Sequence, residues 1–216
     1  AIVAVSGQVA TYLRTRAPDL AHARIETIPN GVDVPSVRAH VQASPPPLDR
    51  PYALFIGKLA RNKGVSALVD VVERARLGIP LVVIGDGPER GLLMEAASRA
   101  RVEIKVLEWL DRQEVFRWLG HASFLIFPSN WPEPLSRVLL EASALCVPIA
   151  AMDTGGTSDA VTDEETGLLS SSPVELAEDV RRLASDSELR QRLGSAAGRR
   201  AESRFDVPIV VGRMEK

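Results

Sequence analysis

The sequence contains little cysteine, few aromatic residues, no long apolar run and no excess of charge of either sign. Cys146 is its only cysteine, which excludes an intrachain disulfide framework and a zinc site built from several cysteines. Aromatic residues make up 5% of the chain, so its core must consist mainly of aliphatic side chains. The 26 basic and 28 acidic residues give a net charge of −2, which disfavours a nucleic-acid partner. A single cysteine fits a reducing, cytoplasmic location.

Apolar runs are too short for a membrane span, which needs about 18 residues or more. The longest candidate, residues 138–152, is interrupted by Glu141, Ser143 and Pro148. The first five residues are apolar, but they lack the basic start and the cleavage site of a signal peptide. We therefore expect no transmembrane segment. The sequence begins in a strand-like run without methionine, so we expect the chain to be part of a longer protein. Peripheral membrane association of that longer protein is left open.

The first 50 residues differ in pattern from the rest. Residues 1–5 and 24–28 predict short strands, and Ser6 can cap a helix that ends near Arg16. Residues 44–47 read Ser-Pro-Pro-Pro and predict a linker, because proline fixes the backbone and lacks an N–H. We expect residues 1–50 to hold the last elements of an N-terminal domain and this linker, and residues 51–216 to form a second domain.

Strand-like and helix-like segments alternate after Pro51. Strands are predicted at residues 52–56, 81–84, 104–107, 124–127 and 148–151, and helices at 65–77, 88–100, 113–119 and 135–145. The strands are continuous apolar runs, which is typical of a sheet buried on both faces. Their alternation with helices predicts an α/β fold with a Rossmann-like, doubly wound parallel sheet. Residues 173–184 and 188–204 predict a helical C-terminal tail.

The loop after the first strand of this sheet is rich in glycine and positive charge. In doubly wound sheets ligands bind at the carboxyl ends of the strands. Gly57 follows the strand, Lys58, Arg61 and Lys63 come next, and Gly64 opens a helix whose N-terminus favours anions. The loop suits a phosphate or diphosphate. A solvated basic loop without a ligand fits equally well.

The loop after the second strand superficially resembles a dinucleotide-binding fingerprint. Its glycines are spaced G-x-G-x-x-x-G from Gly85, and Pro88 stands where a helix starts. A structural turn in which proline begins a helix explains this pattern better. NAD binding is therefore disfavoured.

The segment from Pro128 to Ala142 carries most of the information on function. Glu133 precedes a helix predicted to begin near Leu135, so the amides of residues 135–138 are free to hold phosphate oxygens. Glu141 lies in the second turn of this helix among apolar residues. Burying a carboxylate there is costly unless it accepts hydrogen bonds, and the paired hydroxyls of a ribose are suitable donors. The alternative is a helix-start acid and a structurally paired glutamate.

Other chemistry-bearing residues are less informative. Gly155 and Gly156 follow the fifth strand and permit close approach of a ligand, but a plain β–α turn fits equally. The histidines at 22, 40 and 121 are isolated, and the sequence has no D-x-D motif. We expect no metal site and no cofactor.

Together these loops resemble the group 1 retaining glycosyltransferases of the GT-B fold, in which two Rossmann-like domains face each other across a cleft. The resemblance extends from about Ile2 to Phe205, and its order and spacing are specific. It is carried by Ser6, residues 28–33, Gly57-Lys58-Leu59, Lys63-Gly64, residues 85–88, Pro128-Ser129, Glu133, Glu141, Gly155-Gly156 and residues 166–168.

The resemblance implies that residues 51–216 bind a nucleotide-sugar donor and that the longer protein transfers its sugar to an unknown glycan, lipid or small-molecule acceptor. The implied catalytic residues are Glu133, Lys58 and Lys63. The implied donor-binding residues are Gly57, Leu135, Ser136, Arg137, Val138 and Glu141. Transfer would retain the anomeric configuration and need no metal, and the chain alone, without the N-terminal domain, is expected to be inactive.

Several positions depart from the family pattern. Arginine is usual where Lys58 stands, glycine at Glu108, Ser136 and Cys146, and glutamate at Asp159. A glycine at position 146 often closes the helix in the left-handed conformation, so Cys146 should have a positive φ or the helix should end differently. The departures keep a non-catalytic nucleotide-binding module open as the alternative. A receiver-like signalling domain is disfavoured, because Gly57-Lys58 stands where receivers carry acidic residues.

Overall fold

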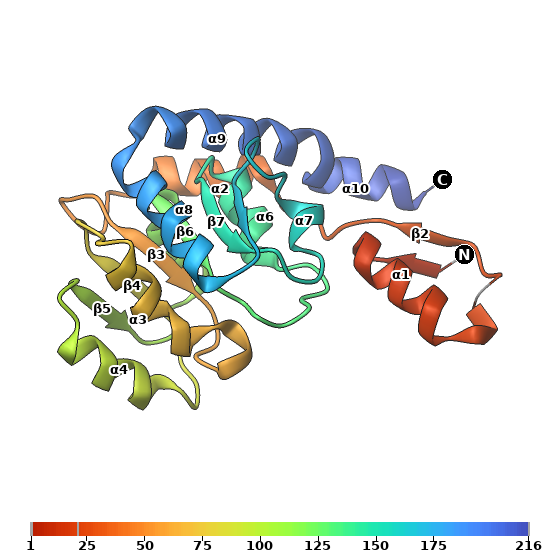
Figure 1. The fold of residues 1–216 in the computed structure, drawn as a ribbon. Helices are drawn as coiled ribbons and strands as arrows, with labels where there is room; N and C mark the ends of the chain where they lie inside the picture. Colours follow the sequence, from red (N-terminus) through yellow and green to blue (C-terminus); the bar gives the residue numbers. More distant parts are fainter. Residues whose placement is uncertain (1, 21, 216) are drawn as a thin grey trace.

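The computed structural model describes residues 2–20 and 22–215 and shows a large α/β unit with a small unit beside it (Figure 1). The small unit consists of β1 (Ile2–Ala4), α1 (Gly7–Arg16) and β2 (Ile25–Thr27). Its two strands are parallel, and Ser6 caps α1 by accepting a hydrogen bond from the Val9 amide at 3.2 Å. The strand, the capped helix and the second strand confirm the local prediction for this segment.

The large unit is built on a parallel sheet of six strands. They are β3 (Ala53–Ile56), β4 (Leu81–Ile84), β5 (Ile104–Leu107), β6 (Phe124–Phe127), β7 (Ile149–Met152) and β8 (Leu168–Ser170). Their order across the sheet is β5-β4-β3-β6-β7-β8. Counted along the sequence this is the 3-2-1-4-5-6 order of doubly wound folds, in which the chain reverses its direction of winding between β3 and β6. The predicted fold class is confirmed.

Helices cover both faces of the sheet (Figure 1). The helices are α2 (Val34–Gln42), α3 (Val65–Arg74), α4 (Arg90–Arg99), α5 (Arg112–Gly120), α6 (Arg137–Ala144), α8 (Pro173–Ser185) and α9 (Ser187–Arg200). Along β3, Leu54 and Ile56 join the core shared with α2, α5 and α6, whereas Ala53 and Phe55 join the core shared with α3 and α8. Each strand needs apolar residues on both sides, which explains the continuous apolar runs in the sequence.

Polar residues in the connecting segments fix where the helices begin. The Asp111 carboxylate accepts a hydrogen bond from the Glu114 amide at 2.9 Å and starts α5. Asp186 starts α9 in the same way through the Leu189 amide at 2.8 Å. Ser172 caps α8, whose first residue is Pro173. Proline is suited to that position because its missing N–H has no helical acceptor there.

Some elements differ from the sequence-based expectation. α2, α7 (Thr157–Ala160), β8 and α10 (Val207–Met214) were not predicted, because each is short or interrupted by turn-forming residues. The single helix predicted for residues 188–204 was wrong at its C-terminal end. α9 ends at Arg200, a π-helical turn follows over Ala201–Phe205, and Asp206 then begins α10.

The segment before the proline-rich residues 44–47 packs on the large unit. α2 contacts α5 and α6, and its residues Val34 and Val37 belong to the same core as Leu54. Residues 34–42 thus complete one face of the six-stranded sheet. The assignment of the first 50 residues to a separate domain stays a prediction.

Candidate functional site

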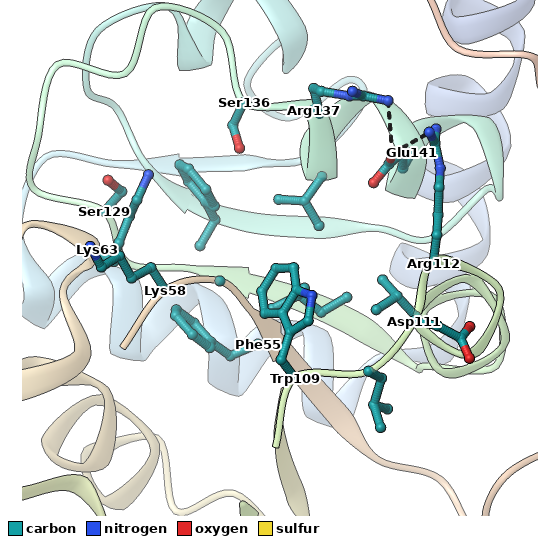
Figure 2. Close-up of a pocket in the computed structure, with 16 residues that line it drawn as sticks. Phe55, Lys58, Lys63, Trp109, Asp111, Arg112, Ser129, Ser136, Arg137 and Glu141 are labelled. Atoms are coloured by element: carbon teal, nitrogen blue, oxygen red, sulfur yellow. Dashed lines mark hydrogen bonds and ion pairs between the residues drawn. The ribbon is translucent and has the colours of Figure 1, made fainter. Parts of the chain in front are cut away.

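A cavity of about 640 Å³ opens at the carboxyl edge of the sheet, between the ends of β3 and β6 (Figure 2). This is the point where the order of the strands reverses, and it is where doubly wound sheets bind ligands. Apolar side chains from the sheet and from α5 form part of its wall, among them Phe55, Phe127 and Val115. Polar and charged side chains come from three loops and from the first turns of α6.

The loop between β3 and α3 contributes two lysines. Gly57 follows β3 directly, Lys58 is exposed beside it, and Lys63 ends the short 3₁₀ turn Arg61–Lys63. Gly57, Lys58 and Lys63 all line the cavity, and Figure 2 shows both lysines at the same end of it. The sequence-predicted basic loop is therefore at the carboxyl edge of the sheet and faces the cavity.

Lys63 is ion-paired with Glu133, from the loop between β6 and α6. The Glu133 side chain is 10% exposed, and its Oε1 also accepts a hydrogen bond from Ser129 Oγ at 3.2 Å. Glu133 thus lies behind the cavity wall and is reached through Lys63 and Ser129, which do line it. An approaching anion meets Lys63 first.

The start of α6 differs from the prediction by two residues. The helix begins at Arg137 with Ser136 at its N-cap, because Pro134 precedes and Leu135 is buried in the core with 6% exposure. The four amides without an acceptor inside the helix are therefore those of residues 136–139, which include three of the four amides named from the sequence. Ser136, Arg137 and Val138 line the cavity, and Leu135 supports it from behind.

Glu141 lies at the opposite end of the cavity from the lysines (Figure 2). Its side chain is 14% exposed and lies 3.5 Å from Arg112 Nη2 and 3.9 Å from Arg137 Nη2. Burial raises the pKa of the Glu141 carboxyl above its ordinary value, and the two arginines oppose that shift. A ligand that donates hydrogen bonds to this nearly buried carboxylate would offset the cost of its burial.

The loop between β5 and α5 was not identified from the sequence as part of the site. Trp109, Leu110, Asp111 and Arg112 all line the cavity, and the Trp109 ring is 62% exposed. The signal that could have found them is positional. They follow the carboxyl end of a predicted strand and join the loops already identified after two other strands of the same sheet.

The Gly85–Pro88 segment supports the β3–α3 loop and does not line the cavity. Leu59 donates its amide to Asp86 O at 2.8 Å, and Glu89 donates its amide to Leu59 O at 2.8 Å. A Cβ at Gly85 would lie 1.9 Å from Gly57 O, so only glycine permits this contact. The prediction of a structural turn is confirmed. The prediction that Pro88 begins the helix was wrong, because α4 begins two residues later, at Arg90, with Glu89 at its N-cap.

The loop after β7 packs against the backbone of Glu133. Gly156 donates its amide to Glu133 O at 2.6 Å. A Cβ at Gly155, which has φ of +59°, would lie 2.3 Å from the same oxygen. The two glycines therefore allow close approach of protein backbone at this edge of the sheet, and they hold the β6–α6 loop in place.

The cavity thus has two chemically different ends. One end carries Lys58, Lys63 and the free amides at the start of α6, which suit the oxygens of a phosphate or diphosphate. The other end carries the Glu141 carboxylate, which suits a ligand with hydroxyl donors. No cluster of three potential metal ligands from histidine, cysteine, aspartate or glutamate occurs within residues 2–20 and 22–215.

No helix within the described part of the chain, residues 2–20 and 22–215, combines the length and the apolar character that crossing a bilayer requires.

The doubly wound sheet defines an α/β domain with a cavity at the reversal point of its strand order. Comparison with known families identifies its family. The sequence model of the glycosyl transferases group 1 matches residues 36–200. The chain belongs to this family.

Characterised relatives include several glycosyltransferases. The chain is 28% identical to the alpha-maltose-1-phosphate synthase of Mycolicibacterium smegmatis, an alignment that covers 95% of this chain and 59% of that protein. It is 32% identical to the glycogen synthase of Mycobacterium tuberculosis, over 85% of this chain and 45% of that protein. The chain thus spans about half to three-fifths of the length of these relatives.

Solved structures with the same fold are GT-B glycosyltransferases. The sucrose-phosphate synthase of Thermosynechococcus elongatus aligns with a TM-score of 0.80 at 25% identity, covering 99% of this chain and 56% of that one. Anabaena HepE in complex with UDP and glucose aligns with a TM-score of 0.83 at 21% identity, covering 99% of this chain and 61% of that one. The expected resemblance to one half of a GT-B fold is confirmed.

Proposed function

We propose that this chain is the donor-binding half of a retaining, metal-independent glycosyltransferase that uses a nucleoside-diphosphate sugar. The observation that carries the proposal is the polarity of the cavity, with lysines and helix amides at one end and a nearly buried glutamate at the other. A nucleoside diphosphate has the matching order of groups, because its ribose hydroxyls and its diphosphate are separated along one molecule. The family is that of the glycosyl transferases group 1, the relatives include an alpha-maltose-1-phosphate synthase and a glycogen synthase, and HepE was crystallised with UDP and glucose.

In this arrangement Glu141 accepts hydrogen bonds from the ribose hydroxyls. Gly57 lets the diphosphate approach the backbone, and Lys58, Lys63 and the amides of Arg137 and Val138 hold its oxygens. Negative charge builds on the diphosphate as the glycosidic bond breaks. Fixed cations and a helix N-terminus stabilise that charge without reorganising, which is the main electrostatic contribution to catalysis.

Glu133 takes the sugar end of the donor. Its carboxylate is paired with Lys63, so a diphosphate that draws Lys63 toward itself leaves Glu133 free to accept hydrogen bonds from sugar hydroxyls. Lys58, Lys63 and Glu133 are therefore the proposed catalytic residues. The lysines supply the positive charge that a metal ion supplies in other transferases, so no cofactor is needed.

The acceptor is a glycan, lipid or small molecule that the N-terminal half of the longer protein binds. We place the longer protein in the cytoplasm, because a single cysteine fits a reducing compartment. The chain alone is proposed to bind donor without transferring sugar. One wall of a cleft cannot position an acceptor or exclude water, and positioning alone can supply roughly 7–11 kcal/mol of the barrier.

A non-catalytic nucleotide-binding module is the second candidate. Ser136 favours it, because this side chain lines the cavity where the family usually has glycine and the backbone must approach the donor. The separating experiment uses the full-length protein with UDP- and GDP-sugars and a broad acceptor set. Sugar transfer that Glu133→Gln abolishes supports the enzyme, and binding without transfer by the full-length protein supports the module.

A further inference from the structure

Residues 153–159 follow β7 and include the first three residues of the single-turn helix α7. They contact two distant parts of the molecule. At one end the Asp159 carboxylate accepts a bifurcated hydrogen bond from the Gly7 amide, with Oδ1 at 3.1 Å and Oδ2 at 3.2 Å. Gly7 is the first residue of α1, and its neighbour Ser6 is completely buried. A helix N-terminus attracts a carboxylate through its free amides, so this bond fixes the small unit to the large one.

Near their N-terminal end, residues 153–159 donate hydrogen bonds to the β6–α6 loop, which carries Glu133. Thr154 Oγ1 donates to Ser129 O at 2.9 Å, and the Gly156 amide donates to Glu133 O at 2.6 Å. Ser129 and Glu133 are the two residues that contact each other behind Lys63. The loop therefore touches the candidate site and α1 at once, over only a few residues.

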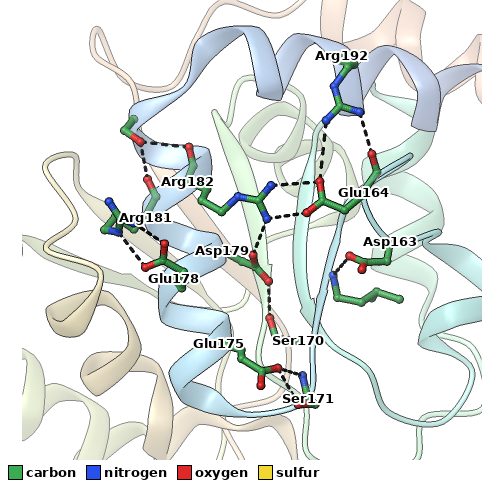
Figure 3. Close-up of polar contacts among 12 residues, drawn as sticks. Asp163, Glu164, Ser170, Ser171, Glu175, Glu178, Asp179, Arg181, Arg182 and Arg192 are labelled. Atoms are coloured by element: carbon green, nitrogen blue, oxygen red, sulfur yellow. Dashed lines mark hydrogen bonds and ion pairs between the residues drawn. The ribbon is translucent and has the colours of Figure 1, made fainter.

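Both flanks of residues 153–159 are anchored. β7 is paired in the sheet with β6 and β8. After α7, the Asp163 carboxylate accepts from the Leu169 amide at 2.8 Å, and Arg182 forms ion pairs with Glu164 and Asp179 (Figure 3). Arg200 Nη2 donates to Asp159 O at 3.1 Å and holds the turn from α9. Packed and hydrogen-bonded segments therefore connect the Glu133 backbone to Asp159 over a short stretch of chain.

We propose that residues 153–159 couple the donor site to the small unit, with Asp159 as the positioning residue that transmits the state of the Lys63–Glu133 pair to α1. The two states are Lys63 paired with Glu133 and Lys63 drawn to an anion in the cavity. Coupling is reciprocal, so fixing α1 also favours one of these states. The role of the anion rests on the proposed function, whereas the coupling itself does not.

The first arm of the test needs no nucleotide. Amide hydrogen exchange of residues 6–10 is measured in the wild-type chain, in Lys63→Met, in Asp159→Ala and in the double variant, because exchange reports local opening. Lys63→Met should change the exchange rate of these amides about five-fold or more, the lower range of measured couplings. The same substitution should have no such effect in the Asp159→Ala background. No change with Lys63→Met, or the same change in both backgrounds, overturns the proposal.

The second arm adds UDP at saturation. UDP should change the exchange of residues 6–10 in the wild type and in Asp159→Asn, which keeps an acceptor for Gly7, but not in Asp159→Ala. Asp163→Ala is the matched control, since it removes a nearby carboxylate whose described hydrogen-bond partner is the Leu169 amide. This variant should retain the response to UDP. A response that persists in Asp159→Ala contradicts the proposal. Failure of UDP to bind contradicts the proposed function and leaves the first arm as the test of coupling.

Discussion

Lys63 on the β3–α3 loop forms an ion pair with Glu133 on the β6–α6 loop, and Ser129 donates a hydrogen bond to the same carboxylate oxygen at 3.2 Å. The pair joins two loops that follow adjacent strands on either side of the reversal point of the sheet. The two proposed catalytic groups therefore neutralise each other's charge. A diphosphate must compete with Glu133 for Lys63.

This pairing leads to a prediction on stability. Lys63→Met should lower the free energy of unfolding by about 1–3 kcal/mol, because it leaves the nearly buried Glu133 carboxylate without its cation. Lys63→Met combined with Glu133→Gln should recover most of the loss. Urea denaturation of the wild type, both single variants and the double variant measures the effect. Additive losses in the double variant would show that the two side chains do not interact in solution.

Glu141→Gln should weaken nucleotide binding about ten-fold or more, since hydrogen bonds to charged groups contribute roughly 1.5–3 kcal/mol. Calorimetric titration measures the affinity. Glu95→Gln on the surface of α4 is the matched control, because Glu95 is exposed and pairs only with Arg99 among the described contacts. Unfolding of Glu141→Gln with unchanged residual binding would assign Glu141 a structural role.

The effect of Glu141→Gln on the free energy of unfolding should depend on pH. Burial raises the pKa of Glu141 in the folded chain above its ordinary value of 4.5, so ionisation of this group opposes folding. That penalty is complete only above the raised pKa of the folded state and disappears as the pH falls below 4.5, where the folded and unfolded states are both protonated. The stability of Glu141→Gln relative to the wild type should therefore be highest near neutral pH and should decline on acidification. Urea midpoints at several pH values test this, and a difference that grows on acidification would contradict it.

Cys146 has φ of +59°, so the prediction of a left-handed residue at the end of α6 is confirmed. Its thiol lies 3.7 Å from Arg38 Nη2, and that contact is lost in either a glycine or an alanine variant. Cys146→Gly should be more stable than Cys146→Ala by about 1 kcal/mol, because only alanine keeps the Cβ that disfavours positive φ. Thermal unfolding compares the two. Equal melting temperatures would mean that the backbone strain at this position is negligible.

Metal independence gives a further prediction. Nucleoside diphosphate affinity should be the same within about two-fold in EDTA and in millimolar Mg²⁺, because the lysines and the α6 amides supply the positive charge. Lys58→Met and Lys63→Met should each weaken binding of the diphosphate more than binding of the free nucleoside. Binding that requires Mg²⁺ would contradict the proposed role of these lysines.

The apolar runs of the central strands were sufficient to predict the doubly wound sheet, because a strand buried on both faces has a distinctive continuous pattern. β8 was missed since three residues give no readable period, and α2 was missed because Pro35 and the neighbouring turn residues obscure its two buried valines. Lys58, Lys63 and Glu141 were identified as site candidates because charge at strand ends or on an apolar helix face is unusual. Trp109 and Arg112 were not, since an exposed aromatic and an exposed arginine near a helix start carry no signal until the three loops are assembled in space.

The proposed donor-binding function requires that this chain binds a nucleotide. The measurement is calorimetric titration of the purified 216-residue chain with UDP and with GDP, with its fold verified by circular dichroism at the same concentration. We expect saturable binding of at least one of the two nucleotides at a single site per chain, and this binding should be lost or weakened in Glu141→Gln. A folded chain that binds neither nucleotide would contradict the donor-binding function.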